Sequence, residues 1–207
     1  MSGKILYRFP VPEARRLASL AGIATDLQAV VEYCRRLESL WLNLRTLDFS
    51  LSEALSTAAV VRYGRCFKSG VRERLPEDAL DVAPAALRDT HKFVIELRDK
   101  HVAHSVNPFE ENEVAVQIAD HYVSSEEIFS INTEHGRAVG LPSDKPVQLR
   151  GLAEWWMAWL EIEMIKEKDM LLTLAKSFTL EELKRNEQSV LVANTSPRTV
   201  GKRRSRP

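Results

Sequence analysis

The sequence has few of the features that mark secreted or membrane proteins. It contains only two cysteines, Cys34 and Cys66, and they are not spaced as metal ligands. We expect both to be buried, reduced thiols, as is usual in the cytoplasm. No apolar run approaches the ~18 residues of a membrane span, and proline interrupts the N-terminal stretch where a signal peptide would lie. We therefore expect a cytoplasmic protein without membrane contact.

The sequence also lacks a net charge, because its 29 basic and 29 acidic residues balance. Five of the basic residues follow Pro197, where no acidic residue occurs. Residues 1–197 therefore carry 24 basic and 29 acidic residues, a net charge of −5. An acidic body does not favour nucleic-acid binding by overall electrostatics, so any RNA contact would be local. Residues 195–207 are predicted to be a disordered basic tail, either simply solvated or weakly bound to RNA or a partner.

Hydrophobic periodicity predicts helices over most of the remaining chain. A short helix over 13–22 is expected to end at Gly22, and a second is expected to begin at Thr25 or Asp26 and reach about residue 45. A third covers 52–68, and a fourth runs from Pro84 to about His104. The last long helix covers about 147–178, and a shorter one follows Thr179.

One region departs from this helical pattern. Residues 113–118 alternate between polar and apolar side chains, and residues 128–132 form a second short β-like run. They predict a β-hairpin within an insert of about 113–141. The predicted fold class is therefore mainly α, an up-and-down helical bundle with a small β-hairpin insert, in one domain over 1–194.

The fourth helix carries an arginine on its apolar face. At about 100° per residue, Arg98 lies about 20° from Leu87, inside the apolar arc, with His91 and His101 beside it. A buried arginine needs a partner, because it cannot lose its charge. Two carboxylates on the apolar faces of other helices, Glu38 and Glu163, are candidates. Arg98 is therefore either in a buried structural ion pair or in a polar cleft where it binds a ligand anion.

The end of this helix, Arg98-Asp99-Lys100-His101-Val102-Ala103-His104, resembles the motif of the HEPN superfamily. In that motif a histidine follows an arginine after four to six residues, and here the gap is five. A polar residue often follows the arginine, and Asp99 matches it. The surrounding LRDKHVAHS is also similar to HEPN-like proteins found near phage-defence and toxin–antitoxin systems. The resemblance extends over about 25–180, and its specific part is shorter than ten residues. On its own, His104 would be an ordinary helix cap or dipole partner.

The HEPN resemblance implies a metal-independent ribonuclease that needs no cofactor and acts as a homodimer, with two motifs facing one cleft. RNA is cleaved when its 2′-hydroxyl attacks the adjacent phosphate. His104 would move the proton and Arg98 would hold the phosphate, which are tasks suited to these side chains. Asp99 would orient a neighbouring group or the RNA. His101 and His91 are further candidates for supporting roles.

Two arginines of the third helix, Arg62 and Arg65, share one side of it and could bind phosphates in the same cleft; a solvated or ion-paired role is the alternative. The whole domain also has alternatives to catalysis. HEPN-like domains serve as noncatalytic RNA or nucleotide binders and as partners of nucleotidyltransferases, and in toxin systems an antitoxin would bind the domain. A purely structural dimerisation domain, with Arg98 in a buried ion pair, is the third reading.

Overall fold

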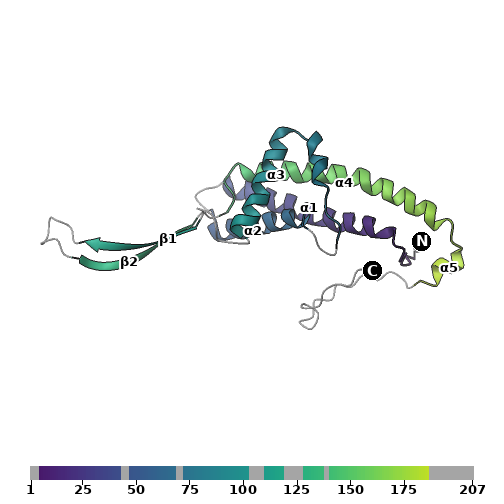
Figure 1. Ribbon diagram of the computed structural model, residues 1–207, viewed down its shortest axis with the longest axis horizontal. Helices are drawn as coiled ribbons and strands as arrows, with labels where there is room; N and C mark the ends of the chain where they lie inside the picture. Colours follow the sequence, from purple (N-terminus) through teal and green to yellow (C-terminus); the bar gives the residue numbers. More distant parts are fainter. Residues whose placement is uncertain are drawn as a thin grey trace.

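The computed structural model describes residues 5–42, 47–68, 72–102, 110–118, 128–137 and 140–186. Within these ranges the protein is mainly helical and contains one small antiparallel sheet of two strands, as the sequence predicts. Figure 1 shows the long helices side by side, with the two strands extending from one end. The predicted basic tail, 195–207, lies outside the described residues.

The N-terminal part of the chain forms one long helix where the sequence predicted two. Helix α1 spans Ala14–Trp41 without a break. The expected end at Gly22 is wrong, because this glycine keeps a helical conformation; Gly140 is the one described residue with positive φ. Glycine inside a helix costs only about 1 kcal/mol, which tertiary packing readily offsets. The expected cap Asp26 is likewise wrong, since this residue is buried in the middle of α1.

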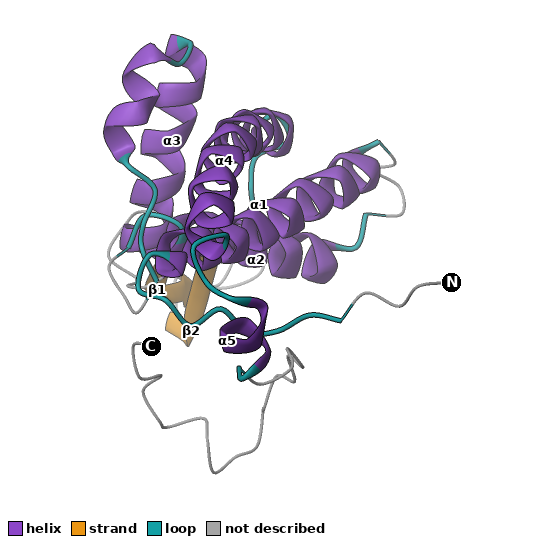
Figure 2. Cartoon of the chain, turned by 90° about the vertical axis from the view of Figure 1, so that its right-hand side faces the viewer, coloured by secondary structure: helices purple, strands orange, loops and turns teal. Residues whose placement is uncertain are grey.

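Helices α2 and α4 both pack against α1. Helix α2 spans Phe49–Arg65, and the side chain of Asp48 caps it by accepting a hydrogen bond from the Leu51 amide at 2.9 Å. Helix α4 spans Lys145–Ala175, close to the predicted bounds, and has Pro146 in its first turn. The short helix α5, Leu180–Lys184, follows. Figure 2, a view along the long axis of the molecule, shows α4 between α3 and α1.

The predicted fourth helix begins as expected but changes its geometry near its end. A 3₁₀ helix, η2, spans Glu77–Val82, and α3 then covers Ala85–Leu97. The next residues form a π-helical turn, η3, over Arg98–Val102. The expected end near His104 lies outside the described residues. π-helical turns occur frequently at functional sites. The position of this turn on the motif therefore makes Arg98 a candidate functional residue.

The core lies where α1, α2 and α4 meet. Its largest fully buried side chains are Trp156 and Tyr63. Cys34 and Cys66 are buried and free, as predicted, and burial raises the pKa of each thiol to about 12. Neither thiol is therefore a nucleophile at neutral pH. No helix in the described part of the chain combines the length and apolar character of a bilayer span.

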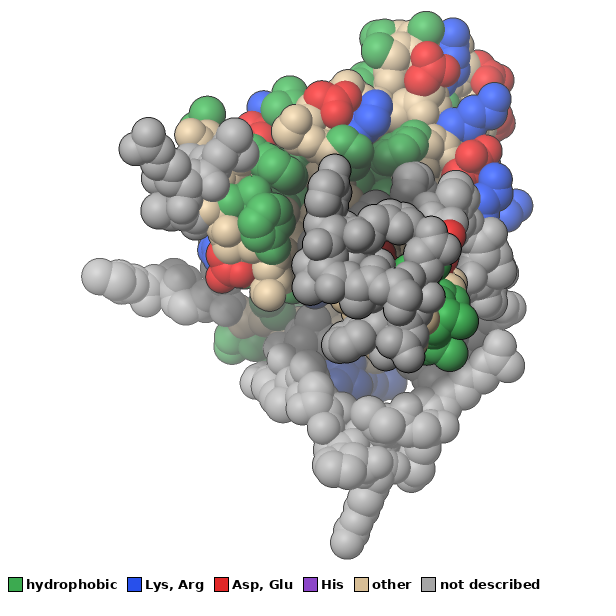
Figure 3. Space-filling view, turned by 90° about the vertical axis from the view of Figure 1, so that its left-hand side faces the viewer, with side chains coloured by type: hydrophobic (Ala, Val, Ile, Leu, Met, Phe, Trp, Pro, Cys, Tyr) green, Lys and Arg blue, Asp and Glu red, His purple; other side chains and the backbone are tan. Residues whose placement is uncertain are grey.

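The β-hairpin extends away from the helices. Strand β1 spans Glu110–Ile118 and pairs antiparallel with β2, Ile128–Arg137, which confirms the predicted hairpin. Among the described residues the strands pair with each other, and Figure 1 shows them beyond the helical body. Apolar side chains on the hairpin are 53–73% exposed, namely Val114, Val116, Ile118, Ile128 and Ile131. In Figure 3, seen from this end of the molecule, hydrophobic side chains lie open beside intermixed acidic and basic ones.

Removing the hairpin should therefore leave the stability of the helical body almost unchanged. Glu110 and Arg137 are cross-strand partners, so a short glycine–serine linker can replace the residues from one to the other. We expect the thermal midpoint to shift by less than about 3 °C, equivalent to about 1 kcal/mol or less. Trp156→Ala is the positive control and should cost about 3–5 kcal/mol. A loss of stability in the variant without the hairpin that is as large as the loss in Trp156→Ala would contradict this expectation.

Candidate functional site

Arg98 crosses the C-terminal part of α2 at a glycine. A Cβ atom on Gly64 would lie 3.1 Å from Cγ and 3.3 Å from Cδ of Arg98, so the absence of a side chain makes room for the arginine stem. The side chain is 32% exposed. Its stem is thus packed between helices while its guanidinium reaches the surface, a common arrangement for arginine. The sequence predicted that Arg98 lies in the middle of the buried face. This prediction holds for the aliphatic stem of the side chain but not for its guanidinium.

Asp99 holds the guanidinium of Arg98. Oδ1 of Asp99 accepts a hydrogen bond from Nη1 of Arg98 at 2.6 Å, and Oδ2 accepts one from Nζ of Lys68 at 2.7 Å. Lys68 and Arg98, in this order of effect, lower the pKa of Asp99. The carboxylate therefore stays ionised at neutral pH and positions two cations. It is unsuited to donate a proton itself.

The two carboxylates predicted to meet Arg98 have other partners. Glu38 accepts a hydrogen bond from Nε of Arg150 at 2.7 Å, which joins α1 to α4. Glu163 accepts one from Nη2 of Arg16 at 3.0 Å, also between these two helices. The predicted pairing of Arg98 with Glu38 or Glu163 is therefore wrong, because α1 and α4 bring their own arginines to these carboxylates. Among the described residues, Arg98 consequently pairs with the partly exposed Asp99 and not with a carboxylate of the core.

His91 lies in an aromatic cluster. Its Nδ1 is 2.8 Å from the Tyr63 hydroxyl, and its ring is 4.7 Å from that of Phe67, centroid to centroid. Burial strongly raises the pKa of Tyr63, so the phenol keeps its proton and can donate it to a neutral imidazole. Burial also lowers the pKa of His91, and Glu77 opposes this weakly. His91 is thus a neutral packing residue at pH 7, and a supporting role in substrate binding stays a prediction.

The remaining histidines of the motif are less fully described. The backbone of His101 forms part of η3. His104, the predicted proton-transfer residue, lies outside the described residues. The structure therefore brings Arg98 and Asp99 together, and it leaves the contributions of His101 and His104 as predictions.

A second charged cluster was missed by the sequence reasoning. The buried carboxylate of Asp26 accepts hydrogen bonds from Nη1 of Arg62 at 2.9 Å and Nη2 of Arg72 at 2.8 Å, and Nη1 of Arg65 lies 3.9 Å away. The structure thus brings the two predicted arginines, Arg62 and Arg65, into one site. A signal for Asp26 was present, since it shares a helical face with Ile23 and Val30. Reading Gly22 as a helix end concealed that signal.

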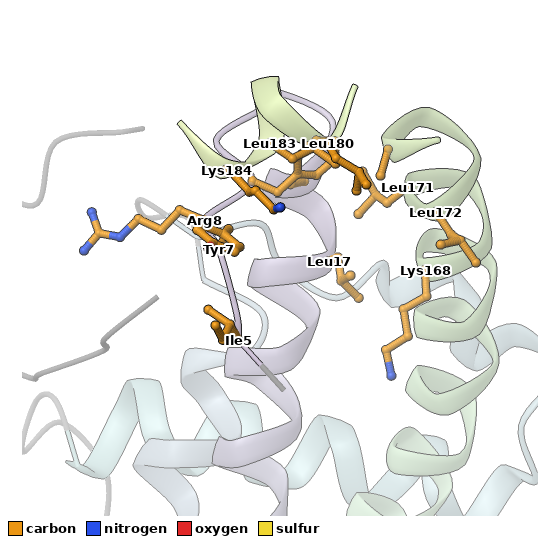
Figure 4. Close-up of a pocket in the computed structure, with 13 residues that line it drawn as sticks. Ile5, Tyr7, Arg8, Leu17, Lys168, Leu171, Leu172, Leu180, Leu183 and Lys184 are labelled. Carbon is orange, nitrogen blue, oxygen red and sulfur yellow. The ribbon is translucent and has the colours of Figure 1, made fainter. Parts of the chain in front are cut away.

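A separate apolar groove of about 650 Å³ lies where the N-terminal segment meets α1, α4 and α5. Figure 4 shows Leu17 of α1 and Leu171 and Leu172 of α4 on its walls, with Leu180 and Leu183 of α5 closing one side. None of the candidate site residues lines it. In the described ranges, no group of three or more histidine, cysteine or acidic side chains is arranged to hold a metal ion.

Comparisons with known proteins provide no relative for this site. No protein-family model, no curated protein and no solved structure matches the chain. Any function assigned to the protein therefore rests on the short motif and on the geometry around Arg98 and Asp26.

The buried position of His91 should make stability depend on pH. Its pKa in the folded protein is lower than the ordinary value of 6.5, so the unfolded chain binds the proton first as the pH falls. The contribution of His91 to the free energy of unfolding should be complete above pH 6.5. It should decline as the pH falls from 6.5 to the lower pKa of His91 in the folded protein. Urea unfolding of the parent and of His91→Gln on both sides of that pH measures this. A difference between the two proteins that does not change with pH would contradict the prediction.

Proposed function

We propose that the protein is a metal-independent ribonuclease of the HEPN type, in which Arg98 binds the scissile phosphate and His104 transfers the proton. The proposal rests on the motif from Arg98 to His104 and is compatible with the helical fold. By the same resemblance, we propose that it acts in the cytoplasm as a homodimer within a toxin–antitoxin or phage-defence system.

The observation that carries the proposal is the placement of Arg98. Its side chain is partly exposed, and its guanidinium bonds to Asp99, whose other oxygen bonds to Lys68. Among the described residues it does not neutralise a carboxylate of the core. A purely structural arginine would be expected to pair with a partly buried acid between helices such as Glu38, which has Arg150 instead. A fixed, partly exposed guanidinium can bind a phosphate and stabilise the negative charge that develops on it.

The proposed reaction follows from the chemistry of RNA. The 2′-hydroxyl attacks the adjacent phosphorus while His104 accepts its proton, and the bond to the 5′-oxygen breaks. The leaving oxygen takes up a proton from the His104 imidazolium of the same or the second subunit, and a 2′,3′-cyclic phosphate remains. Arg98 stabilises the charge on the non-bridging oxygens throughout. Asp99 acts as a positioning residue, because as an ionised group it fixes the guanidinium of Arg98.

A noncatalytic RNA- or nucleotide-binding module is the second candidate. The excess of arginine over acid around Asp26 favours it, since phosphate binding alone would use such a cluster. The two candidates differ in what His104 contributes. Binding without cleavage requires Arg98 but no proton-transfer residue. An antitoxin or a nucleotidyltransferase as partner fits either candidate.

Incubation of the protein with total RNA and with tRNA in EDTA tests the ribonuclease. We expect the parent to cleave RNA and to leave cyclic phosphate ends. His104→Ala and Arg98→Gln should each reduce the rate by a factor of roughly 10²–10⁴, the usual contribution of an acid–base group or an oxyanion-stabilising group. Gel analysis of end-labelled RNA measures both the rate and the type of end.

His135→Ala is the matched control, because this histidine is exposed on the hairpin, where its Nδ1 bonds to Asn112. It should retain parental activity. Absence of cleavage by the parent on every RNA tested would refute the ribonuclease proposal. If the parent and Arg98→Gln then bind a 2′-O-methyl RNA with different affinities, the binding module would be the better explanation.

The contact between Gly64 and Arg98 allows a test that leaves every charge in place. In Gly64→Ala the new methyl group would lie 3.1 Å from Cγ of Arg98 and push its stem aside by a few tenths of an ångström. Displacements approaching 1 Å in an active site can cost about a hundredfold in rate, so we expect a loss of roughly tenfold. Gly151→Ala is the control, because no atom lies within 4 Å of its added methyl group. Equal rates for the two variants would argue against a role for the position of Arg98.

A further inference from the structure

The Asp26 cluster holds three arginines around one buried carboxylate. Asp26 is 5% exposed, and each of its oxygens accepts one short hydrogen bond, Oδ1 from Arg62 at 2.9 Å and Oδ2 from Arg72 at 2.8 Å. The hydrogen bond that Arg62 donates to Asp26 is the largest cause that raises the pKa of Arg62. A buried carboxylate with both oxygens bonded is satisfied, so the ion pairs explain why Asp26 can lie in the bundle.

The cluster contains more positive charge than Asp26 requires. One bidentate arginine would neutralise a carboxylate, yet two bond to it and a third, Arg65, has its Nη1 3.9 Å from Oδ1. That distance exceeds a hydrogen bond, and the Arg65 side chain is 57% exposed. Three guanidinium groups beside one carboxylate leave two unbalanced positive charges in a protein body whose net charge is negative. Mutual repulsion of these cations would be relieved by a bound anion.

Two of the three arginines, Arg62 and Arg72, are also held in place before any ligand arrives. A Cβ atom on Gly22 would lie 3.1 Å from Nη1 of Arg72, so this glycine allows the guanidinium to lie against α1. Arg62 is held by its hydrogen bond to Oδ1 of the buried Asp26 carboxylate at 2.9 Å. Guanidinium groups fixed in this way lose little further conformational entropy on binding, which favours affinity for an anion.

Two carboxylates on neighbouring segments, Glu73 and Asp99, face other cations. Glu73, which follows Arg72 in sequence, has its Oε2 3.9 Å from Nη1 of Arg16. Asp99 bonds to Lys68 and to Arg98. The cluster and Arg98 also share one end of α2, because Arg62 and Arg65 flank Gly64, over which Arg98 lies.

We propose that Arg62, Arg65 and Arg72 form a second phosphate-binding site, which holds another phosphodiester of the RNA strand whose scissile phosphate Arg98 binds. Arg65 contacts the phosphate directly, and Asp26 positions Arg62 and Arg72 beside it. This inference rests on the proposed function as far as the ligand is RNA. The second site would also explain why both groups of arginines lie at the same end of α2, because a single RNA strand could then contact both.

Binding of a 2′-O-methyl RNA oligonucleotide tests the site separately from catalysis, because the blocked 2′-oxygen cannot attack the phosphate. Arg65→Gln is the variant of choice, since this side chain is exposed and makes no short bond to Asp26. We expect its affinity to fall several-fold at low salt. The slope of log affinity against log salt should decrease by about 0.7, the contribution of one phosphate contact to single-stranded RNA. Fluorescence anisotropy at several salt concentrations measures both quantities.

Arg36→Gln is the matched control, because Arg36 is similarly exposed and pairs with Glu32 on α1, and its loss removes the same charge. It should leave affinity and salt slope near the parental values. Equal affinities for the parent and Arg65→Gln, or equal losses in the two variants, would overturn the proposal. Thermal stabilisation by pyrophosphate that depends on Arg65, together with RNA binding that does not, would overturn the assignment of RNA as the ligand. If the parent does not cleave RNA but its affinity for RNA depends on Arg65, only the ribonuclease proposal would be refuted.

Discussion

The buried carboxylate of Asp26 joins the parts of the molecule that carry its candidate chemistry. It lies in α1, and its two oxygens bond to Arg62 of α2 and to Arg72 of the segment that leads to α3. An ionised carboxylate at this depth requires such partners, so the bonds fix α2 and the following segment relative to α1. The position of the C-terminal end of α2 determines in turn where Gly64 lies, and hence where Arg98 can cross the helix.

Around this end of α2, two carboxylates organise five cations. Asp26 holds Arg62 and Arg72 with Arg65 close by, and Asp99 holds Lys68 and Arg98. The two acids differ in depth, because Asp26 is buried whereas Asp99 is partly exposed. Asp26 therefore stabilises the arrangement of the helices, whereas Asp99 positions the side chain of Arg98 at the surface. Both leave positive charge available to a ligand, which is the common basis of the two proposals made for this region.

Periodicity predicted the elements of the fold well, because most of them follow from local patterns. The hairpin was evident from the alternation in β1, and α4 from its long apolar stripe. The continuity of α1 was not, since Gly22 gives the same local signal whether it ends a helix or makes room for a distant arginine. The partners of Glu38 and Glu163 were also mistaken, because a helical wheel gives the direction of a side chain but not the residue of another helix that it meets. The motif around Arg98 was visible from its spacing, whereas the π turn that begins there was not.

The two glycines that face arginines have a consequence for how the sequence can change over time. Gly22 lies against Arg72, and Gly64 lies against Arg98. In each pair a larger residue at the glycine position fits only if the partner becomes shorter or moves. Among descendants of this sequence that keep the fold, positions 22 and 72 should vary together, and so should positions 64 and 98. Gly151, which faces open space, should vary independently of any partner.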